Sequence, residues 1–415
     1  MKTLLIHNIA ILATNQGKSA VDAKKMAQLS LLEDAAVAIS EGKIREIGPS
    51  KELRKKYEKN SQLLDAQQTV ALPGFVEPHT HLPFVGSREQ EFEMRVLGKS
   101  YVEISQAGGG ILNTVEKVRK ASEEELLQTA KKHAWNLAKC GVTTVEAKSG
   151  YGLDLETELK QLRVLRRLQK EHPLDFVPTF LGAHEIPPEY RNNRNAYIRL
   201  LLEEVLPRVR QENLAEFCDI FCEEHVFSVQ ESRRILRRAK ELGFGLKIHA
   251  DEIRPLGGAE LAAELGAISA DHLGAISLQG IQALAKNNVV GVLLPGTSFS
   301  LKLPYAPAKK LMEAGVPLAL STDLNPGSSM TESMPLMLTL ACLYLEMTPY
   351  QAITAATLNA AAAINRAHVC GTLEVGKWAD IALWDIPHPR YLPYHYGVNL
   401  LKFLIKKGEV LPLSP

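Results

Sequence analysis

The stretch Val70-Ala71-Leu72-Pro73-Gly74-Phe75-Val76 runs directly into Glu77-Pro78-His79-Thr80-His81 and places two histidines at the end of an apolar strand. Alternate residues of a strand point to the same face, so the imidazoles of His79 and His81 can bind one cation together. Two neighbouring histidines are on their own more often surface or packed residues than a metal site. The pair therefore suggests a metal-dependent hydrolase whose other ligands must lie further along the chain.

Three later apolar runs also end in residues of this chemistry. They are 245–248, which precedes His249 and Glu252; 267–270, which precedes Asp271 and His272; and 316–321, which precedes Asp323. Buried carboxylates and imidazoles are costly unless they are paired or bound to a metal, so several at strand ends favour a site over a core. Neutral imidazoles with one carboxylate suit zinc or iron, with a position left for water.

From about residue 71, strand patterns alternate with amphipathic helix patterns, which indicates βα units and a parallel sheet. Ser122 opens one predicted helix as the N-cap of a capping box with Glu125, and further helices are predicted over 256–265, 307–314 and 349–366. Eight strands are predicted, as a (β/α)8 TIM-like barrel requires. They cover 74–78, 143–148, 176–181, 218–222, 245–248, 267–270, 289–294 and 316–321. The polar residues follow the carboxyl ends of these strands, where such barrels have their active sites.

Both flanks of this α/β region have β patterns. Within residues 1–70, Ala36–Ile39 and Lys43–Ile47 flank a turn, and after residue 370 the segment Trp378–Trp384 is strand-like. Chain termini often lie close together at the surface, so the two segments can pair. We predict a small composite β-sandwich domain built from residues 1–70 and 370–415, beside a barrel of residues 71–369.

The composition fits a soluble cytoplasmic enzyme. The 415 residues are 46% hydrophobic, and 48 basic against 47 acidic residues give a net charge of +1, which argues against a nucleic-acid partner. The five cysteines are few and odd in number, which favours buried reduced thiols over metal ligands. No apolar stretch reaches transmembrane length, and Met1–Ile6 is too short for the core of a signal peptide, so no membrane partner is expected.

The order of these motifs resembles the amidohydrolase superfamily. The resemblance begins at Pro73–His81, continues through His249, His272 and Asp323, and ends at Gly371–Asp380. Within the superfamily, the chain is similar to the ring-opening hydrolases of histidine degradation, and the motifs that carry this similarity span nearly the whole chain. They lie at 108–111, 146–153, 181–184, 221–223, 247–252, 269–273 and 322–328.

This resemblance implies a set of functional residues. His79, His81, His249 and Asp323 would hold one Zn²⁺ or Fe³⁺ ion per chain, and a water on that ion would be the nucleophile. The residues that match the substrate pocket of the family are Arg88, Tyr101, Tyr151, His184, Glu252, Asn325, Gly327 and Ser328. Glu77 stands where the family usually has Asp, and residues 82–84 also differ, but neither change touches an implied ligand.

The implied substrate is 4-imidazolone-5-propanoate, a cyclic amide that water would open to N-formimidoyl-L-glutamate. A metal lowers the pKa of bound water towards ~7, and attack on the carbonyl builds negative charge that the metal or His272 can stabilise. Asp323 and Glu252 could take a proton from the water and return one to the leaving nitrogen. Which of the two carboxylates has which role stays open.

Structural explanations compete with the functional ones at four positions. They are Arg88 in an ion pair with Glu89 or Glu91, Tyr151 as the aromatic residue of a turn, His184 as a satisfied core histidine, and Lys148 as the salt-bridge partner of Glu146. A carboxylated Lys148 that bridges two metals is disfavoured, because the second strand is the wrong position for it and the family resembled is mononuclear.

Two other classes of protein also stay open. A cytosine- or guanine-deaminase-like enzyme would share the four metal ligands, His272 and Glu252, but would not need an arginine for a carboxylate tail. A catalytically inactive scaffold of the same superfamily predicts missing ligands, whereas all four are present. The sequence does not decide between a monomer and a homodimer.

Overall fold

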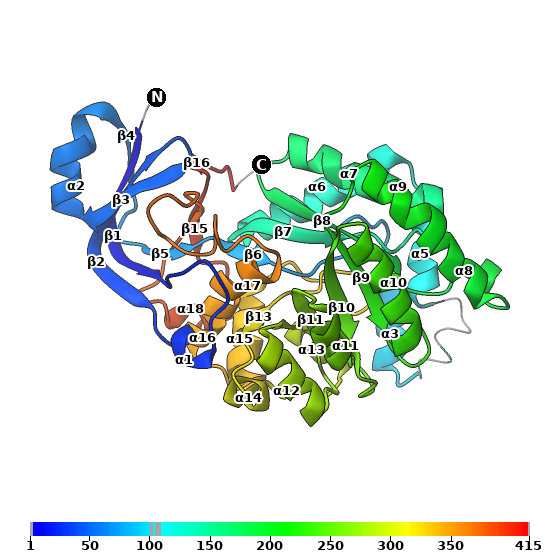
Figure 1. The fold of residues 1–415 in the computed structure, drawn as a ribbon. Helices are drawn as coiled ribbons and strands as arrows, with labels where there is room; N and C mark the ends of the chain where they lie inside the picture. The colour runs from blue at the N-terminus through cyan, green and yellow to red at the C-terminus, as the bar shows by residue number, and fades with distance from the viewer. Residues whose placement is uncertain (1–2, 100–102, 104–108, 414–415) are drawn as a thin grey trace.

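The computed structural model describes residues 3–99, 103 and 109–413, so the predicted site residue Tyr101 lies outside the described residues. At its centre is a sheet of eight parallel strands, in which each strand pairs with the next one along the chain (Figure 1). The strands are β6 (Phe75–Glu77), β7 (Val142–Lys148), β8 (Asp175–Ala183), β9 (Phe217–Cys222), β10 (Gly245–Ala250), β11 (Ser269–His272), β12 (Val290–Leu293) and β13 (Leu318–Leu320).

The two edges of this sheet meet just beyond its first and last strands. Thr80 and Leu324 form a parallel bridge, and the amide of His81 donates to the carbonyl oxygen of Leu324 at 3.0 Å. All eight predicted strands are present, and the predicted (β/α)8 TIM-like barrel is confirmed.

Helices on the outside of the barrel separate successive strands. α6 (Glu123–Lys139) begins after Ser122, whose hydroxyl accepts a hydrogen bond from the amide of Glu125 at 3.1 Å, as the predicted N-cap requires. Other helices between strands are α7 (Leu155–Glu171), α8 (Arg194–Leu200), α9 (Leu206–Gln211), α10 (Val229–Glu241), α11 (Gly258–Leu265), α12 (Leu278–Asn287) and α14 (Ala308–Glu313). No helix among the described residues is long and apolar enough to cross a membrane.

The prediction of one helix over 349–366 is wrong. The chain forms α16 (Pro349–Ala355) and α17 (Leu358–Ala363), with a break at Thr357, where φ is −126° and ψ is −92°. The hydroxyl of Thr357 donates to the carbonyl oxygen of Ile353 at 2.7 Å, a local bond that competes with helix continuation. After the break, Ala360 and Ile364 share one buried cluster with side chains of the barrel strands, so α17 covers the inside of the barrel at the end opposite the site.

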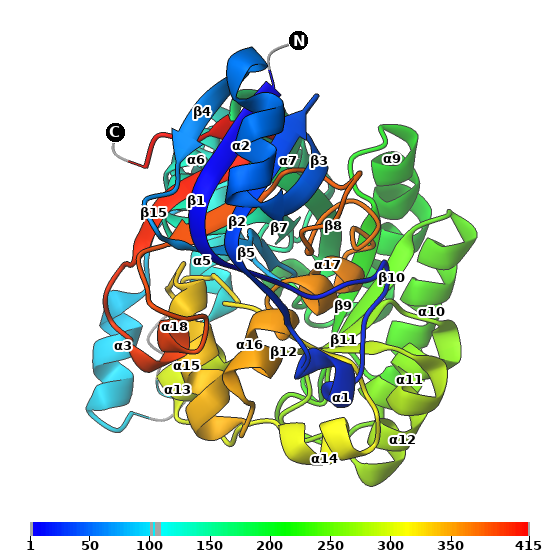
Figure 2. The same ribbon diagram turned by 90° about the vertical axis from the view of Figure 1, so that its left-hand side faces the viewer.

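A second sheet combines the two ends of the described chain. Its order is β16-β15-β14-β5-β1-β2-β3, with β4 paired to β1. Figure 2 shows its C-terminal strands, in red, beside the N-terminal strands, in blue. The strands are β1 (Thr3–Thr14), β2 (Ser30–Ser40), β3 (Lys43–Pro49), β4 (Ser61–Asp65), β5 (Val70–Pro73), β14 (Ile381–Trp384), β15 (Leu401–Lys406) and β16 (Glu409–Val410).

The predicted pairing of the N- and C-terminal segments in a small β-rich unit is therefore confirmed. The strands form one connected sheet, because β1 pairs with β4 through its first residues and with β5 through Ile11 and Leu12. Ile6, Val37 and Leu383 lie in one buried cluster to which both ends of the described chain contribute. The segments thus share a core as well as a sheet.

The chain passes from the small sheet into the barrel at Gly74. β5 ends at Pro73 and β6 begins at Phe75, and a Cβ on Gly74 would collide with the side chain of Thr143 on β7. A close approach of backbone to side chain therefore requires glycine here. The division into 1–70, 71–369 and 370–415 stays a prediction.

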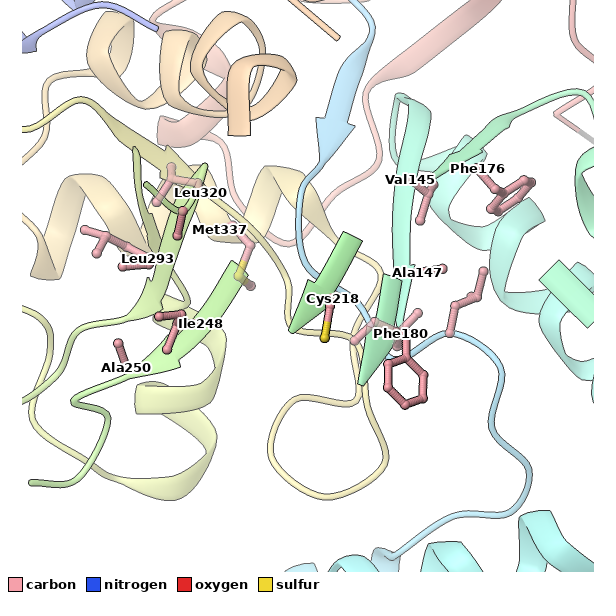
Figure 3. Packing of buried hydrophobic residues seen from close by; sticks show 14 of the residues in the cluster. Val145, Ala147, Phe176, Phe180, Cys218, Ile248, Ala250, Leu293, Leu320 and Met337 are labelled. Carbon is pink, nitrogen blue, oxygen red and sulfur yellow. The ribbon is translucent and has the colours of Figure 1, made fainter. Parts of the chain in front are cut away.

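Apolar packing holds the barrel strands in place. Figure 3 shows part of this buried cluster, with Ala147 on β7, Phe180 on β8, Ile248 on β10 and Leu320 on β13 among its members. All four side chains are fully buried. Because protein interiors are close-packed, the residues that follow these strands start from fixed positions.

Candidate metal centre and active site

The four predicted metal ligands come together at the carboxyl end of the barrel. His79 and His81 follow β6, His249 lies near the end of β10, and Asp323 follows β13. The Nε2 atoms of His79 and His81 each lie 3.5 Å from Oδ1 of Asp323. The ring centroids of His79 and His249 are 4.5 Å apart. Ligand atoms of His79, His81 and Asp323 lie within 4.8 Å of one another, so these three residues could hold a metal ion.

Buried ligand atoms without hydrogen-bond partners mark this centre. Among the described residues, His79 Nε2, His249 Nε2 and Asp323 Oδ1 have no hydrogen-bond partner, although the three residues are at most 3% exposed. An unpaired buried polar atom costs about 1–3 kcal/mol, so several in one cluster fit a shared cation. His272 forms a further ligand group with His79 and His249, so distances alone leave His249 and His272 as rival ligands.

Hydrogen bonds to its second oxygen orient Asp323. Thr297, in the first turn of α13 (Pro295–Leu301), donates to Oδ2 at 2.6 Å, and Ser328 donates to the same atom at 3.0 Å. The backbone of Asp323 is left-handed, with φ at 54°, a conformation that its surroundings must hold in place. Burial raises the pKa of Asp323 to about 6. Because both donors bind Oδ2, Oδ1 of Asp323 has no hydrogen-bond partner among the described residues and lies beside the histidines.

Carboxylates on the far side of the rings contact the other nitrogen of two histidines. Asp271 Oδ2 accepts a hydrogen bond from Nδ1 of His79 at 2.6 Å, which leaves Nε2 of His79 unprotonated. Asp219 Oδ2 lies 3.0 Å from Nδ1 of His249. Burial and the charge of Lys148 lower the pKa of His79 well below its ordinary value, so the ring is neutral, as a metal ligand must be.

Glu252 and His272 lie beside the ligand cluster. Nδ1 of His272 is 3.5 Å from Oε1 of Glu252, and its ring centroid is 5.5 Å from that of His79. Burial and the charge of Asp323 raise the pKa of Glu252 to about 8, so this carboxyl group carries a proton at neutral pH. His272 has φ at 75°, which turns the chain sharply at the end of β11.

A cavity of about 1170 Å³ extends from the ligand cluster to α3 (Glu89–Val96). Its volume is ample for a small-molecule substrate. The predicted pocket residues that line it are Arg88, Tyr151, His184, Glu252, Asn325, Gly327 and Ser328. The structure therefore brings together every predicted pocket residue that it describes.

Arg88 lies in this cavity next to Glu91. Nη2 of Arg88 is 2.6 Å from Oε2 of Glu91, and the side chains are 10% and 7% exposed, so this alternative ion pair exists but is mostly buried. Nε of Arg88 has no hydrogen-bond partner in the part of the chain that the structure describes. A Cβ on Gly327 would collide with the guanidinium, so glycine leaves room for Arg88. The guanidinium therefore keeps donors that an anion could use.

The loop after β7 is held by Glu158 on α7. Its carboxylate accepts hydrogen bonds from the amides of Gly150 at 3.1 Å and Gly152 at 2.9 Å. Nδ1 of His184 donates to the carbonyl oxygen of Gly150 at 2.9 Å, and its ring stacks on that of His81 with centroids 4.9 Å apart. His184 is thus a satisfied buried histidine and a cavity residue at once.

Known proteins share the fold and the sequence of this chain. Residues 70–412 match the amidohydrolase family. The chain is 50% identical over 409 residues to an imidazolonepropionase of Clostridium tetani (strain Massachusetts / E88), with 98% of both chains covered. It is 51% identical over 410 residues to an imidazolonepropionase of Porphyromonas gingivalis (strain ATCC BAA-308 / W83), with 98% of this chain and 97% of the relative covered. The chain belongs to the imidazolonepropionase family.

Membership of this amidohydrolase family makes the protein a metal-dependent hydrolase. The imidazolonepropionase fold is shared with solved deaminases. An adenosine deaminase from Xanthomonas campestris with bound zinc has a TM-score of 0.71 and 20% identity to this chain. The match covers 98% of this chain and 92% of the deaminase. A guanine deaminase from E. coli has a TM-score of 0.74 and 13% identity, with 99% of both chains covered. At these identities the likeness shows the fold alone.

The residues behind the proposed ligands do not stand out as a motif in the sequence. Asp219 lies between Cys218 and Ile220 in a buried strand, and a lone carboxylate in an apolar run is a signal that could have found it. Asp271 is noticed only as a polar strand ending. Thr297 gives no signal, because its role depends on where α13 lies relative to β13. Lys148 pairs with Glu146 as expected, at 2.7 Å, but it also contacts Asp219.

Proposed function

We propose that this protein hydrolyses the cyclic amide of 4-imidazolone-5-propanoate to N-formimidoyl-L-glutamate, a step of L-histidine degradation. The observation that carries the proposal is the cluster of ligand atoms on His79, His249 and Asp323 that are unpaired among the described residues, beside a cavity that contains the mostly buried Arg88. Identity of about half over nearly the full length to imidazolonepropionases supports the choice of substrate.

His79, His81, His249 and Asp323 would hold one Zn²⁺ or Fe³⁺ ion per chain. Three imidazoles and a carboxylate suit either metal, and the unpaired buried atoms fit such an ion. When bound, the ion supplies a water of lowered pKa and a Lewis acid for the amide carbonyl. We assign His249 rather than His272 because Nε2 of His249 has no hydrogen-bond partner among the described residues and Asp219 lies 3.0 Å from its Nδ1, whereas Nδ1 of His272 faces Glu252.

Asp323 and Glu252 would divide the proton transfers. The pKa of Asp323, about 6, leaves it ionised at neutral pH and able to accept a proton from the attacking water. The pKa of Glu252, about 8, lets it donate a proton to the ring nitrogen as the C–N bond breaks. His272, next to Glu252, would donate a hydrogen bond to the carbonyl oxygen while negative charge develops there.

Arg88 would bind the propionate tail. Its guanidinium offers a planar fork of donors that matches a carboxylate, and Glu91 holds that fork in the cavity. Tyr101, Tyr151 and His184 would line the substrate pocket. Asn325, Gly327 and Ser328 would shape the cavity wall, where the side-chain oxygen of Asn325 accepts hydrogen bonds from the amides of Gly327 at 2.8 Å and Ser328 at 2.9 Å.

A substrate comparison tests this function. Purified, metal-loaded protein is incubated separately with 4-imidazolone-5-propanoate, cytosine and guanine, and the loss of ring ultraviolet absorbance is followed. We expect turnover of the first compound only, with N-formimidoyl-L-glutamate as the product. Turnover of cytosine or guanine would favour the deaminase alternative, and a metal-loaded protein inert towards all three would favour the scaffold.

The deaminase alternative is not favoured by the comparisons. The two deaminases share the fold at 13% and 20% identity, whereas the imidazolonepropionases share about half of their residues with this chain. The chain also carries Arg88 in the cavity, which a purine or pyrimidine ring does not require. The cytoplasmic location stays a prediction, and the choice between a monomer and a homodimer stays open.

A further inference from the structure

A second group of buried charges lies next to the proposed metal ligands. Lys148 and Glu146 on β7, Asp219 on β9 and Asp271 on β11 are all fully buried. Nζ of Lys148 lies 2.7 Å from Oε1 of Glu146, 2.8 Å from Oδ2 of Asp219 and 3.9 Å from Oδ2 of Asp271. One ammonium is therefore shared by carboxylates from three strands.

Each of these carboxylates contacts a segment that carries a proposed ligand. Asp219 Oδ2, which contacts Lys148, is also the oxygen 3.0 Å from Nδ1 of His249. Asp271 Oδ2 accepts the hydrogen bond from His79. Glu146 Oε2 accepts a hydrogen bond from the amide of Thr80 at 3.3 Å, and the Glu146 carbonyl accepts one from the Thr80 hydroxyl at 2.7 Å.

The same group resembles a second cation site. Ligand atoms of His79, Asp219 and Asp271 lie within 4.8 Å of one another, which is close enough for a metal ion. The ammonium of Lys148 already supplies a cation there, through its contacts with both carboxylates. Buried carboxylates without a counter-charge would be costly. Lys148, together with Lys247 at 3.5 Å from Oδ2 of Asp271, therefore lets them stand behind the histidines as anions.

We propose that Lys148 is a positioning residue for the metal centre. Its ammonium contacts Asp219 and shares Asp271 with Lys247. These carboxylates contact His249 and His79, and Lys148 thereby sets how tightly the metal is retained. Partners behind metal-bound histidines fix ring orientation, and losing one typically weakens metal binding about 10- to 100-fold. This proposal rests on the metal centre of the proposed function.

Lys406 offers a matched control for a purely structural role. Its Nζ lies 2.7 Å from Oδ2 of Asp380 and 2.8 Å from Oδ2 of Asp175, and its side chain is 2% exposed. It therefore joins two carboxylates as Lys148 does. Asp175 is the first residue of β8, at the end of the barrel opposite the proposed metal ligands. Among the described residues, neither carboxylate forms a hydrogen bond or ion pair with a proposed ligand.

The test compares zinc retention in Lys148→Met and Lys406→Met. Each purified variant is loaded with Zn²⁺, and transfer of zinc to an excess of a chromophoric chelator is followed without substrate. We expect zinc affinity about 10- to 100-fold weaker in Lys148→Met and close to the parent value in Lys406→Met. A merely structural role would lower the unfolding temperature of both variants and change zinc affinity in neither.

A second variant covers the case in which Lys148→Met does not fold. Glu146→Gln/Lys148→Met removes one charge of each sign and should fold with the same loss of zinc affinity. Parent-like zinc affinity in either folded variant, an equal loss in Lys406→Met, or failure of both Lys148 variants to fold would overturn the proposal. Because zinc retention is measured without substrate, failure to hydrolyse imidazolonepropionate would count against the proposed function alone.

Discussion

The two ends of the cavity are built in different ways. At the metal end, His79, His249 and Asp323 follow or end buried strands and are at most 3% exposed. At the other end, Arg88 precedes the short helix α3, on which Phe92 is 54% exposed. The proposed metal ligands are thus fixed by the packed barrel, while the group proposed to recognise the substrate tail depends on a few local contacts.

This difference between the two ends predicts where a substitution should stop the reaction and where it should alter substrate specificity. At the metal end, Asp323 has two hydrogen-bond donors on its second oxygen, and His79 has Asp271 on its second nitrogen. At the tail end, Arg88 is held by Glu91 and fits beside Gly327. Loops on a rigid scaffold are where specificity commonly resides.

The largest effect is expected from His249→Ala at the metal end. Removing a proposed ligand should abolish metal binding and reduce hydrolysis to background, because the water would lose its activation. Elemental analysis of the parent should give about one metal per chain. His272→Ala is the control, since it should keep the metal and lose rate. If His272→Ala loses the metal and His249→Ala keeps it, the assignment of the two rivals is reversed.

Glu252→Gln should come next, because it preserves shape while removing the acidic proton. Metal content should be unchanged, and kcat should fall by about 10²- to 10⁴-fold, the usual contribution of general acid catalysis. If kcat of the variant equals that of the parent, Glu252 does not donate the proton and Asp323 alone must transfer protons.

The same assignment fixes the sign of a pH effect. A carboxyl group with a pKa raised to about 8 is protonated below that pH and ionised above it. The parent kcat should therefore fall about tenfold per pH unit above about 8, and this decline should be absent in Glu252→Gln. An unchanged decline in the variant would assign the titration to another group.

Arg88→Met tests the end of the cavity where the substrate tail is proposed to bind. Methionine removes the charge but retains an apolar stem, so kcat/KM should fall about 10²- to 10³-fold while metal content stays constant. The decisive comparison uses an analogue whose tail carboxylate is a neutral amide. An equal penalty on both substrates would show that Arg88 only orders its loop. A larger penalty on the carboxylate substrate would sharpen the contrast between the two ends.

The smallest effect is expected from Thr297→Val, which removes one of the two donors to Asp323 Oδ2. Ser328 remains as a donor, so we expect metal affinity to weaken by about tenfold at most. Thr297→Ser keeps the hydroxyl and should behave like the parent. Competition with a chelator measures all three proteins. A parental affinity in Thr297→Val would mean that Ser328 alone orients the carboxylate.

Much of the fold follows from the sequence because strand periodicity and turn residues act locally. The eight barrel strands and the N-cap at Ser122 are examples. The break at Thr357 was not predictable in the same way, because helix continuation there competes with a side-chain bond and with packing of α17 into the barrel. Local propensity cannot include contacts that exist only after the chain has folded.

For the site, the motifs locate the proposed ligands and the proposed pocket residues but not the residues that support them. His79, His81, His249 and Asp323 are visible as polar endings of apolar strands. The pairing of Asp219 with Lys148 joins β9 to β7, and the bond from Thr297 to Asp323 joins α13 to the end of β13. These contacts depend on three-dimensional register, which one sequence does not reveal.

The small sheet can be completed only late in synthesis, because its strands come from both sides of the barrel in the sequence. β5 pairs with β14, which is made only after the whole barrel has been made. Until then, the edge of β5 that β14 later covers presents free backbone groups, which can pair with another chain. We therefore expect the N-terminal strands of a nascent chain to be most prone to aggregation before β14 joins the sheet.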